Sequence, residues 1–256
     1  MCFDADAHPP IPVIAGGALE SAELTLRAAD GNEFTAFRAR AAAPGGAGIV
    51  ILPDVRGLYT YYEELALRFA EAGVDAVAFD YFGRTAGLGS RDAEFDYPPH
   101  VQQTTYAGLS ADITATAEFL RSAKGGAPRS VFVVGFCFGG RIAFDASTLG
   151  LGLAGAIGFY GMPVGPRGDL PAPAEVAGDM ANPILGLFGG ADAHITREVL
   201  TEFDNALTQA GVQHRIVSYP DAPHSFFDRK FEEHAAAAAD AWHQVLGFIA
   251  ANTASA

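Results

Sequence analysis

A cysteine between glycines stands where the chain is expected to turn sharply from a strand into a helix. The segment Gly135-Phe136-Cys137-Phe138-Gly139-Gly140 follows the apolar run Val131 to Val134 and precedes the helical run Arg141 to Phe144. In such a G-x-nucleophile-x-G elbow, side chains at the flanking positions would clash with the strand and the helix. The start of the helix favours a thiolate at Cys137 and offers the N–H of Phe138 to an oxyanion. The segment predicts a cysteine nucleophile; the alternative is a small buried core residue.

A nucleophile of this kind needs a base and an acid that orients the base. On a sheet with this elbow the expected chain order is nucleophile, acid, histidine. Asp192 and His224 each follow a short apolar run, and ligands bind outside the carboxyl ends of parallel strands. We therefore expect Cys137, Asp192 and His224 to converge at one edge of a sheet. His194 is the rival base, but it lies only two residues after Asp192 and cannot easily receive that carboxylate.

The remaining histidines and cysteines give little support for a metal or a disulfide. His214, His234 and His243 share no HExxH or CxxC spacing, so we expect neither a metal site nor a cofactor. The two cysteines, Cys2 and Cys137, lie far apart in the sequence. No disulfide framework is expected.

Short apolar runs alternate with helical stretches along most of the chain. A hairpin is indicated from Glu23 to Arg40, around Asp30-Gly31-Asn32. The alternation predicts an α/β fold, with a mostly parallel sheet covered by helices on both faces. Two stretches, 83–105 and 161–182, do not fit it, and long loops of this kind often wall a binding site. The expected strands are 47–52, 74–79, 130–134, 154–159, 183–188 and 213–219, and the expected helices are 61–72, 110–123, 197–210 and 231–250.

Length and composition are those of a folded α/β protein. The chain has 256 residues, of which 50% are hydrophobic and 18% are charged, a balance typical of globular domains. Folds of the α/β class often use this length as one unit. We expect an N-terminal tail over residues 1–20 and a single domain over 21–252.

Charge and hydropathy exclude several classes of partner. The 16 basic residues are outnumbered by 30 acidic ones, which gives a formal charge of −14 and argues against binding to nucleic acid or to an acidic membrane surface. The most apolar stretch, Ala235 to Ala251, is interrupted by Asp240, His243 and Gln244, so no transmembrane helix is expected. Residues 1–6 lack a basic start and an apolar segment, which predicts no secretory signal and a cytoplasmic location.

The sequence resembles the dienelactone hydrolase family, cysteine-dependent α/β-hydrolases that are also called carboxymethylenebutenolidases. The resemblance runs from about Ile49 to Phe248 and implies a single-domain α/β-hydrolase fold. Its specific parts are Gly135-Phe136-Cys137-Phe138-Gly139-Gly140, Asp80-Tyr81-Phe82-Gly83-Arg84, Gly190-Ala191-Asp192 and Pro223-His224-Ser225-Phe226.

The resemblance also implies an activity. Enzymes of the family hydrolyse enol-lactones that carry a free carboxylate. By this pattern Cys137 is the nucleophile, His224 is the base, and Asp192 orients it. A role in the degradation of aromatic compounds is implied by the resemblance alone.

Two arginines are implied as ligands of the substrate carboxylate. Arg84 falls where the family has its carboxylate-binding arginine, and a planar guanidinium matches a carboxylate with two hydrogen bonds. The family often has another arginine four residues after the histidine. That position is Asp228 here, and Arg229 comes next. If the stretch is helical, the one-residue shift turns the side chain by about 100°.

Further roles follow from the same alignment. Asp54 occupies the position of a glutamate that helps to ionise the thiol, although aspartate is one methylene shorter. The N–H of Val55 would be the second oxyanion donor, beside that of Phe138. Aromatic side chains are expected to line an apolar pocket, with Tyr81 and Phe226 against the substrate. The candidates are Tyr59, Tyr81, Phe82, Phe136, Phe138, Tyr160 and Phe226.

Two other functions stay open on these residues. The same machinery serves a general carboxylesterase or thioesterase on small acyl substrates. A protein that binds ligands without turnover, or that senses oxidants through Cys137, would show a peroxide-sensitive thiol and no hydrolysis of activated esters. The expected partner is a small-molecule lactone or ester, and the expected assembly is a monomer or a homodimer.

Overall fold

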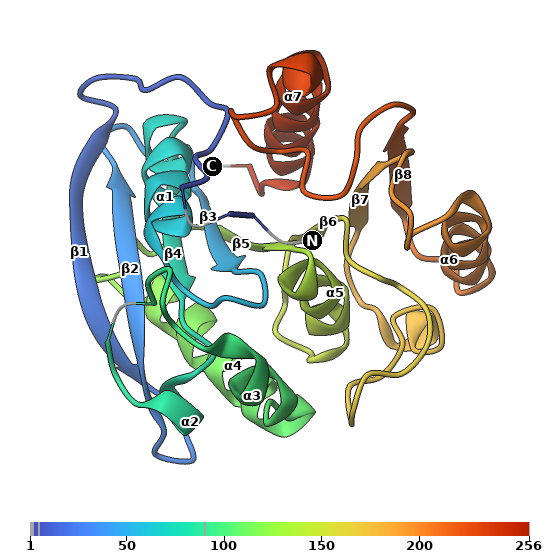
Figure 1. Cartoon of the computed structure of the whole chain (residues 1–256). Coiled ribbons are helices and arrows are strands. Elements are labelled where there is room, and N and C mark those ends of the chain that lie inside the picture. The colour runs from blue at the N-terminus through green and yellow to red at the C-terminus, as the bar shows by residue number, and fades with distance from the viewer. Residues whose placement is uncertain (1–2, 5, 90, 256) are drawn as a thin grey trace.

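The residues that the structure describes, 3–4, 6–89 and 91–255 of a computed structural model, form one sheet of eight strands (Figure 1). The strands are β1 (Ala18–Arg27), β2 (Glu33–Ala41), β3 (Ala47–Leu52), β4 (Val74–Phe79), β5 (Ser130–Phe136), β6 (Gly155–Phe159), β7 (Ile184–Gly189) and β8 (His214–Tyr219). Their order in the sheet is β1-β2-β4-β3-β5-β6-β7-β8. The β1–β2 and β2–β4 pairs are antiparallel, and the others are parallel. The predicted α/β architecture and its N-terminal hairpin are confirmed.

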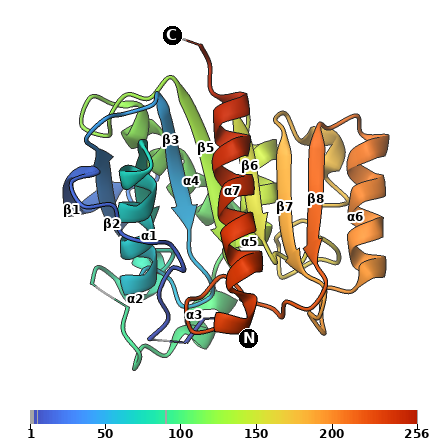
Figure 2. The same ribbon diagram turned by 90° about the horizontal axis from the view of Figure 1, so that it is seen from above.

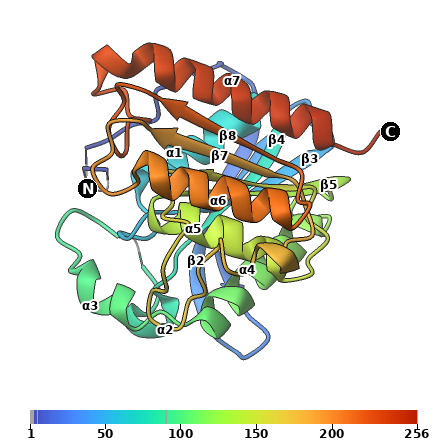
Figure 3. The same cartoon turned by 90° about the vertical axis from the view of Figure 1, so that its right-hand side faces the viewer.

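Helices cover both faces of the sheet. On one face, α1 (Thr60–Glu71) packs against α7 (Ala235–Asn252) through Phe69 and Trp242, whose ring centroids lie 4.8 Å apart. Figure 3 shows α7 above the sheet, and α4 (Tyr106–Arg121), α5 (Phe138–Asp145) and α6 (Arg197–Gln209) below it. Figure 2 shows α6 beside β8, at the end of the sheet opposite the hairpin. Because both faces are covered, β3, β4, β5, β6 and β7 are buried along their whole length.

The two stretches that did not fit the alternation contain short helices. The first holds α2 (Gly83–Ala86) and α3 (Tyr97–Gln102), and the second holds a 3₁₀ turn, η2 (Ala177–Asp179). Two further turns are η1 (Ala146–Thr148) and η3 (Glu232–His234). Helix α3 carries Pro98 in its first turn, where no intrahelical hydrogen bond is lost. Elements this short have too few turns to show an amphipathic period, so the sequence did not reveal them.

The segment near the N-terminus, predicted as a tail, is partly buried. Cys2 lies outside the described residues. Phe3 is 2% exposed and stacks on Tyr61, with ring centroids 4.1 Å apart. The carbonyl oxygen of His8 accepts a hydrogen bond from the N–H of Arg229 (3.1 Å), and the N–H of His8 donates to the Asp228 carboxylate (3.3 Å). This segment therefore packs against the core and holds the chain just after His224.

Candidate active site

Cys137 occupies the turn between β5 and α5. Its backbone has φ 54° and ψ −110°, a left-handed φ that costs a residue with a Cβ on the order of 1–3 kcal/mol. The N–H of Cys137 donates to the carbonyl oxygen of Phe159 (3.0 Å), which ties the turn to the neighbouring strand β6. The strained strand-to-helix turn that the glycine pattern predicts is present.

The turn requires glycines because backbone atoms of neighbouring segments occupy the space that a Cβ would fill. A Cβ on Gly135 would lie 1.9 Å from the carbonyl oxygen of Gly139, and one on Gly139 would lie 2.2 Å from the carbonyl oxygens of Leu52 and Pro53. These approaches set the start of α5 directly against the end of β3. The chain that continues from β3 into Asp54 and Val55 is thereby brought next to Cys137.

The close approach at Gly139 predicts a large loss of stability in Gly139→Ala. Since the neighbours are backbone carbonyls that cannot turn aside, we expect the free energy of unfolding to fall by about 3 kcal/mol. Gly247→Ala is the matched control, because Gly247 is also helical and a Cβ there meets nothing within 4 Å. The control should gain roughly 0.5–1 kcal/mol. Urea denaturation measures both, and equal effects would contradict the packing argument.

His224 and Asp192 are directly hydrogen-bonded. Nδ1 of His224 lies 2.5 Å from Oδ2 of Asp192, whose side chain is 1% exposed. The other carboxylate oxygen accepts hydrogen bonds from the N–H groups of His194 (2.9 Å) and Ile195 (3.3 Å). The carboxylate of Asp192 thus orients the His224 ring. The backbone N–H of His194 in turn holds this carboxylate in place.

Several residues around His224 and Cys137 have a strained backbone conformation. Tyr160 and Ser225 have φ 38° and 59° and, with Cys137, make up three of the four described non-glycine residues with positive φ. The Tyr160 ring packs on the His224 ring, with centroids 4.9 Å apart. Strained residues of this kind persist where the surroundings hold them, commonly at functional sites.

The charges of these groups are coupled. Burial lowers the pKa of His224, but hydrogen bonds with Asp192 and Cys137, and their negative charges, outweigh it and raise the pKa from 6.5 to about 9. Burial raises the pKa of Asp192, but the hydrogen bonds from His224 and from the N–H of His194 outweigh it and hold this pKa below its usual value. Near neutral pH the arrangement favours an imidazolium at His224 beside a thiolate at Cys137.

This coupling predicts how His224 titrates. Its pKa in the folded state is raised from 6.5 to about 9, so its protonation stabilises the fold fully below pH 6.5, and that stability is lost as the pH rises through 9. Asp192→Asn should lower the pKa of His224 toward 6.5, because the carboxylate no longer stabilises the imidazolium. NMR titration of the histidine signals measures it, with the His224 signal assigned from its loss in His224→Gln. An unchanged pKa in Asp192→Asn would contradict the coupling.

Asp54 lies next to the elbow and is fully buried. One carboxylate oxygen accepts from the N–H of Arg56 (2.8 Å), and the other accepts from the hydroxyl of Tyr59 (3.2 Å). Burial, together with negative charge at Cys137, raises the pKa of Asp54 from 3.8 to about 7. The ionisation of Asp54 therefore depends on the charge of the Cys137 thiol. Both of its carboxylate oxygens are held by hydrogen bonds from neighbouring groups.

The two expected oxyanion donors lie in the segments that meet at the elbow. Phe138 is the first residue of α5, and its N–H has no partner within the helix. Val55 lies in the loop after β3 and is 8% exposed. Among the described residues, neither N–H donates to another group of the chain. Both are available to an oxyanion.

A pocket of about 400 Å³ opens over Cys137. The elbow and the His224 ring line the pocket, and one wall comes from the loop between β6 and β7. This loop lies in the stretch 161–182, which the sequence predicts as a wall of the site. The lining residues are Cys137, Phe138, Arg141, Tyr160, Met162, Val164, Gly165, Pro166, Arg167, His194, Ile195 and His224.

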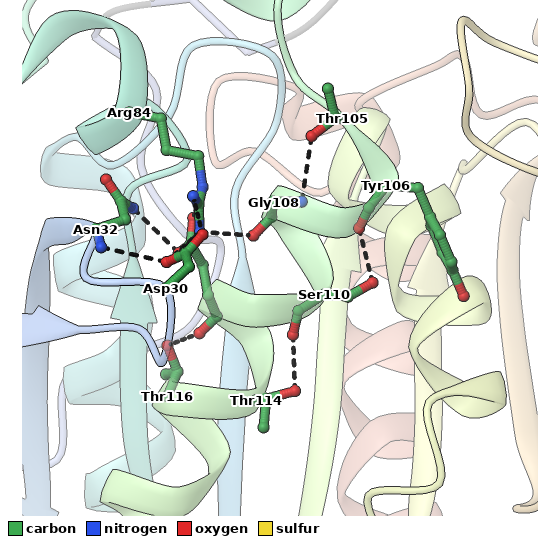
Figure 4. Close-up of polar contacts among 10 residues, drawn as sticks. Asp30, Asn32, Arg84, Thr105, Tyr106, Gly108, Ser110, Thr114 and Thr116 are labelled. Carbon is green, nitrogen blue, oxygen red and sulfur yellow. Dashed lines mark hydrogen bonds and ion pairs between the residues drawn. The ribbon is translucent and has the colours of Figure 1, made fainter.

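Arg84 does not lie among the described residues that line this pocket. Figure 4 shows its guanidinium between Asp30, with which it forms an ion pair, and the carbonyl oxygen of Gly108 (3.2 Å). It also bonds the buried carboxylate of Asp112 (2.8 and 3.2 Å). The expected carboxylate ligand is instead held by two carboxylates of the protein, because the hairpin turn and α4 bring them to it.

The other expected substrate contacts are also away from the pocket lining. The Arg229 side chain is exposed, and the hydroxyl of the buried Tyr81 donates to the carbonyl oxygen of Pro53 (2.7 Å). Phe226 is fully buried and packs on Tyr160, with ring centroids 5.8 Å apart. Tyr81 and Phe226 thus support the site from behind.

Two arginines of the pocket, Arg141 and Arg167, are not predicted from the sequence. Arg141 lies one helical turn after Cys137 in α5. Its spacing of four residues from Cys137 could have indicated that both side chains lie on the same face of the helix. Arg167 lies in a stretch rich in Gly and Pro, where no regular pattern indicates which way a side chain points.

The described residues hold neither a metal-binding cluster nor a membrane-spanning helix. No group of three or more His, Cys, Asp or Glu side chains there is placed to hold a metal ion. No helix in the described part of the chain has the length and apolarity needed to cross a membrane.

Comparisons with known proteins agree with this architecture. The model of the dienelactone hydrolase family matches residues 34–253. A protein of Salmonella typhimurium with the provisional name carboxymethylenebutenolidase is 30% identical, over 97% of this chain and 94% of its own length. A provisionally named dienelactone hydrolase from Klebsiella pneumoniae superposes with a TM-score of 0.81 at 27% identity, covering 90% of this chain and 98% of that one. A dienelactone hydrolase-like promiscuous phosphotriesterase from metagenomic libraries shares the fold, with a TM-score of 0.76 at 20% identity over 93% of this chain and 100% of that one. With a family match that spans most of the chain, this protein belongs to the dienelactone hydrolase family and is a hydrolase of ester or lactone bonds.

Proposed function

We propose that the protein hydrolyses a small lactone or ester that carries a carboxylate, through Cys137, His224 and Asp192 and a thioester intermediate. The observation that carries the proposal is the His224 ring, which bonds Asp192 on one side (2.5 Å) and Cys137 on the other. That is the nucleophile–base–acid series needed for acyl transfer. A pocket of about 400 Å³ above Cys137 is large enough for a small ring and its substituents.

In the first step the Cys137 thiolate attacks the carbonyl carbon of the substrate. A C–S bond forms, and the electron pair of the carbonyl moves onto oxygen, where the N–H groups of Val55 and Phe138 stabilise it. The tetrahedral intermediate collapses and the C–O bond to the leaving oxygen breaks. That oxygen takes the proton of the His224 imidazolium. An enol leaving group stabilises its own anion, so a thiol suffices as nucleophile.

In the second step water cleaves the thioester. Neutral His224 takes a proton from the water as its oxygen bonds to the acyl carbon, and the C–S bond then breaks to release the acid. The thiolate and the imidazolium are restored. Asp192 keeps the His224 ring in one orientation through both steps. Burial and the negative charge of the Cys137 thiolate raise the pKa of Asp54, so this carboxyl ionises more readily while Cys137 is held in the neutral thioester.

The first test is substrate selection by the wild-type protein. The loss of ultraviolet absorbance of cis- and trans-dienelactone is followed beside the release of p-nitrophenol from p-nitrophenyl acetate. We expect fast loss of at least one lactone isomer. Ester turnover without lactone turnover would assign a general esterase, and turnover of neither by a folded protein would overturn hydrolysis at Cys137.

A further inference from the structure

Arg167 is a cation in the wall of the Cys137 pocket, on the loop between β6 and β7. We propose that Arg167 binds the substrate carboxylate, the role that the family resemblance implies for Arg84, and that it selects acyl groups with a negative charge. This inference rests on the proposed hydrolysis at Cys137 and adds the residue that determines specificity.

The side chains that line the pocket are basic, on a strongly acidic protein. The chain carries a formal charge of −14, yet the described lining residues include Arg141, Arg167 and two histidines and no Asp or Glu. Burial lowers the pKa of Arg141, and the carboxylates of Asp145 and Glu175 act in the opposite direction. The positive charge of Arg167 lowers this pKa further, so the two guanidiniums lie close enough to repel each other. An anion in the pocket would relieve this repulsion.

Arg167 is available for such an anion. Its side chain is exposed, and the ion pairs found among the described residues include none with it. The nearby Asp169 is engaged elsewhere, because its carboxylate accepts from the N–H of Tyr106 at the start of α4 (3.1 Å). Arg84, by contrast, is held by Asp30 and Asp112.

The backbone of Arg167 is held in place. Arg167 and Leu170 exchange two backbone hydrogen bonds (3.3 and 3.0 Å), and Leu170 is 3% exposed. On either side of this turn the guanidinium of Arg141 donates to the carbonyl oxygens of Gly165 (2.7 Å) and Pro171 (2.5 Å). Arg141 is a positioning residue that fixes the loop, and the fixed loop presents Arg167 to the pocket.

Arg167 lines the same pocket as Cys137 and His224. Its guanidinium carbon is 4.7 Å from the centroid of the Phe138 ring, over the ring, and Phe138 follows Cys137 directly. The aromatic face attracts the cation and limits its motion. A substrate whose carbonyl carbon meets the thiol then reaches Arg167 with a carboxylate only a few atoms away, where the guanidinium binds it with two hydrogen bonds.

The test compares two esters that differ in charge, mono-p-nitrophenyl glutarate and p-nitrophenyl pentanoate. Arg167→Gln should lower kcat/KM for the glutarate ester roughly 10- to 100-fold, mostly through KM, because a hydrogen-bonded charge pair is lost. The pentanoate ester should change by less than about twofold. Arg167→Lys keeps the charge without the planar fork and should lie between. Arg215→Gln, an exposed arginine on β8, is the matched control and should change neither ester.

A binding measurement separates this inference from the proposed reaction. Glutarate itself is titrated into Cys137→Ala protein with NMR detection, and adding Arg167→Gln should weaken its binding roughly tenfold or more. If wild-type protein hydrolyses no ester but glutarate binding still depends on Arg167, the reaction fails and the binding role stands. Equal losses for both esters, selective loss in Arg229→Gln instead, or glutarate binding that ignores Arg167 would each overturn the proposal.

Discussion

Cys137→Ala is expected to lower kcat for dienelactone and for p-nitrophenyl acetate by on the order of 10⁴- to 10⁶-fold, because no other group can form the acyl-enzyme. The elbow should survive the substitution, since alanine keeps the Cβ and removes only the sulfur. Steady-state assays measure the loss, and circular dichroism with thermal melting checks the fold.

The matched control for this prediction is the other thiol of the chain. Cys2→Ala should retain wild-type turnover, whereas an acyl group trapped during turnover should be found on Cys137 by peptide mass analysis. Residual activity in Cys137→Ala within about tenfold of wild type would show that another nucleophile carries the reaction. Peroxide should inactivate the wild-type protein, and oxidation located on Cys137 by peptide mass analysis would report the same thiol, because thiolates oxidise most readily.

His224→Ala is the second large effect, with an expected loss of on the order of 10⁴-fold or more in steady-state turnover. The substitution removes the cation that favours the Cys137 thiolate and also leaves the thioester without a base to activate water. At alkaline pH the thiol still ionises, so acylation by p-nitrophenyl acetate should go forward while deacylation lags. We expect at most one equivalent of p-nitrophenol per protein, together with an acetylated Cys137.

His243→Ala is the matched control, because His243 is exposed on α7 and far along the chain from the elbow. It should turn over at the wild-type rate. A His224→Ala protein that releases p-nitrophenol continuously at near wild-type rate would contradict the assignment of His224. If His194→Ala caused the large loss instead, the base would be the neighbour that supports Asp192.

Much of the fold followed from local sequence. The elbow is fixed by residues within a few positions of Cys137, since glycines on each side are what the close backbone contacts require. The strand ends that carry Asp192 and His224 could be placed because apolar runs with Gly and Pro at their ends define parallel strands well. The positions of these side chains at one edge of the sheet then followed from the α/β topology.

Contacts between distant segments could not be predicted in the same way. Arg84 is preceded by a family-like motif, but its partners Asp30 and Asp112 lie 54 and 28 residues away. Whether such an arginine faces substrate or is neutralised depends on packing, which one sequence does not reveal. Arg167 has no family-like motif beside it, yet it lines the pocket. The sequence did not indicate this, because its loop has no periodicity and is held by the contacts of Arg141 with carbonyl oxygens.

The contacts between the first described residues and the chain after His224 have a consequence for biosynthesis. Phe3 and His8 leave the ribosome before Asp228 and Arg229 by roughly 10–40 s at ordinary elongation rates, so the hydrogen bonds between His8 and these residues form late. The elbow can assemble on the nascent chain while its base has not yet been synthesised. The nascent protein therefore holds Cys137 in its elbow without the imidazolium that favours the thiolate until nearly all of the domain has emerged, and the thiol is activated only at the end of folding.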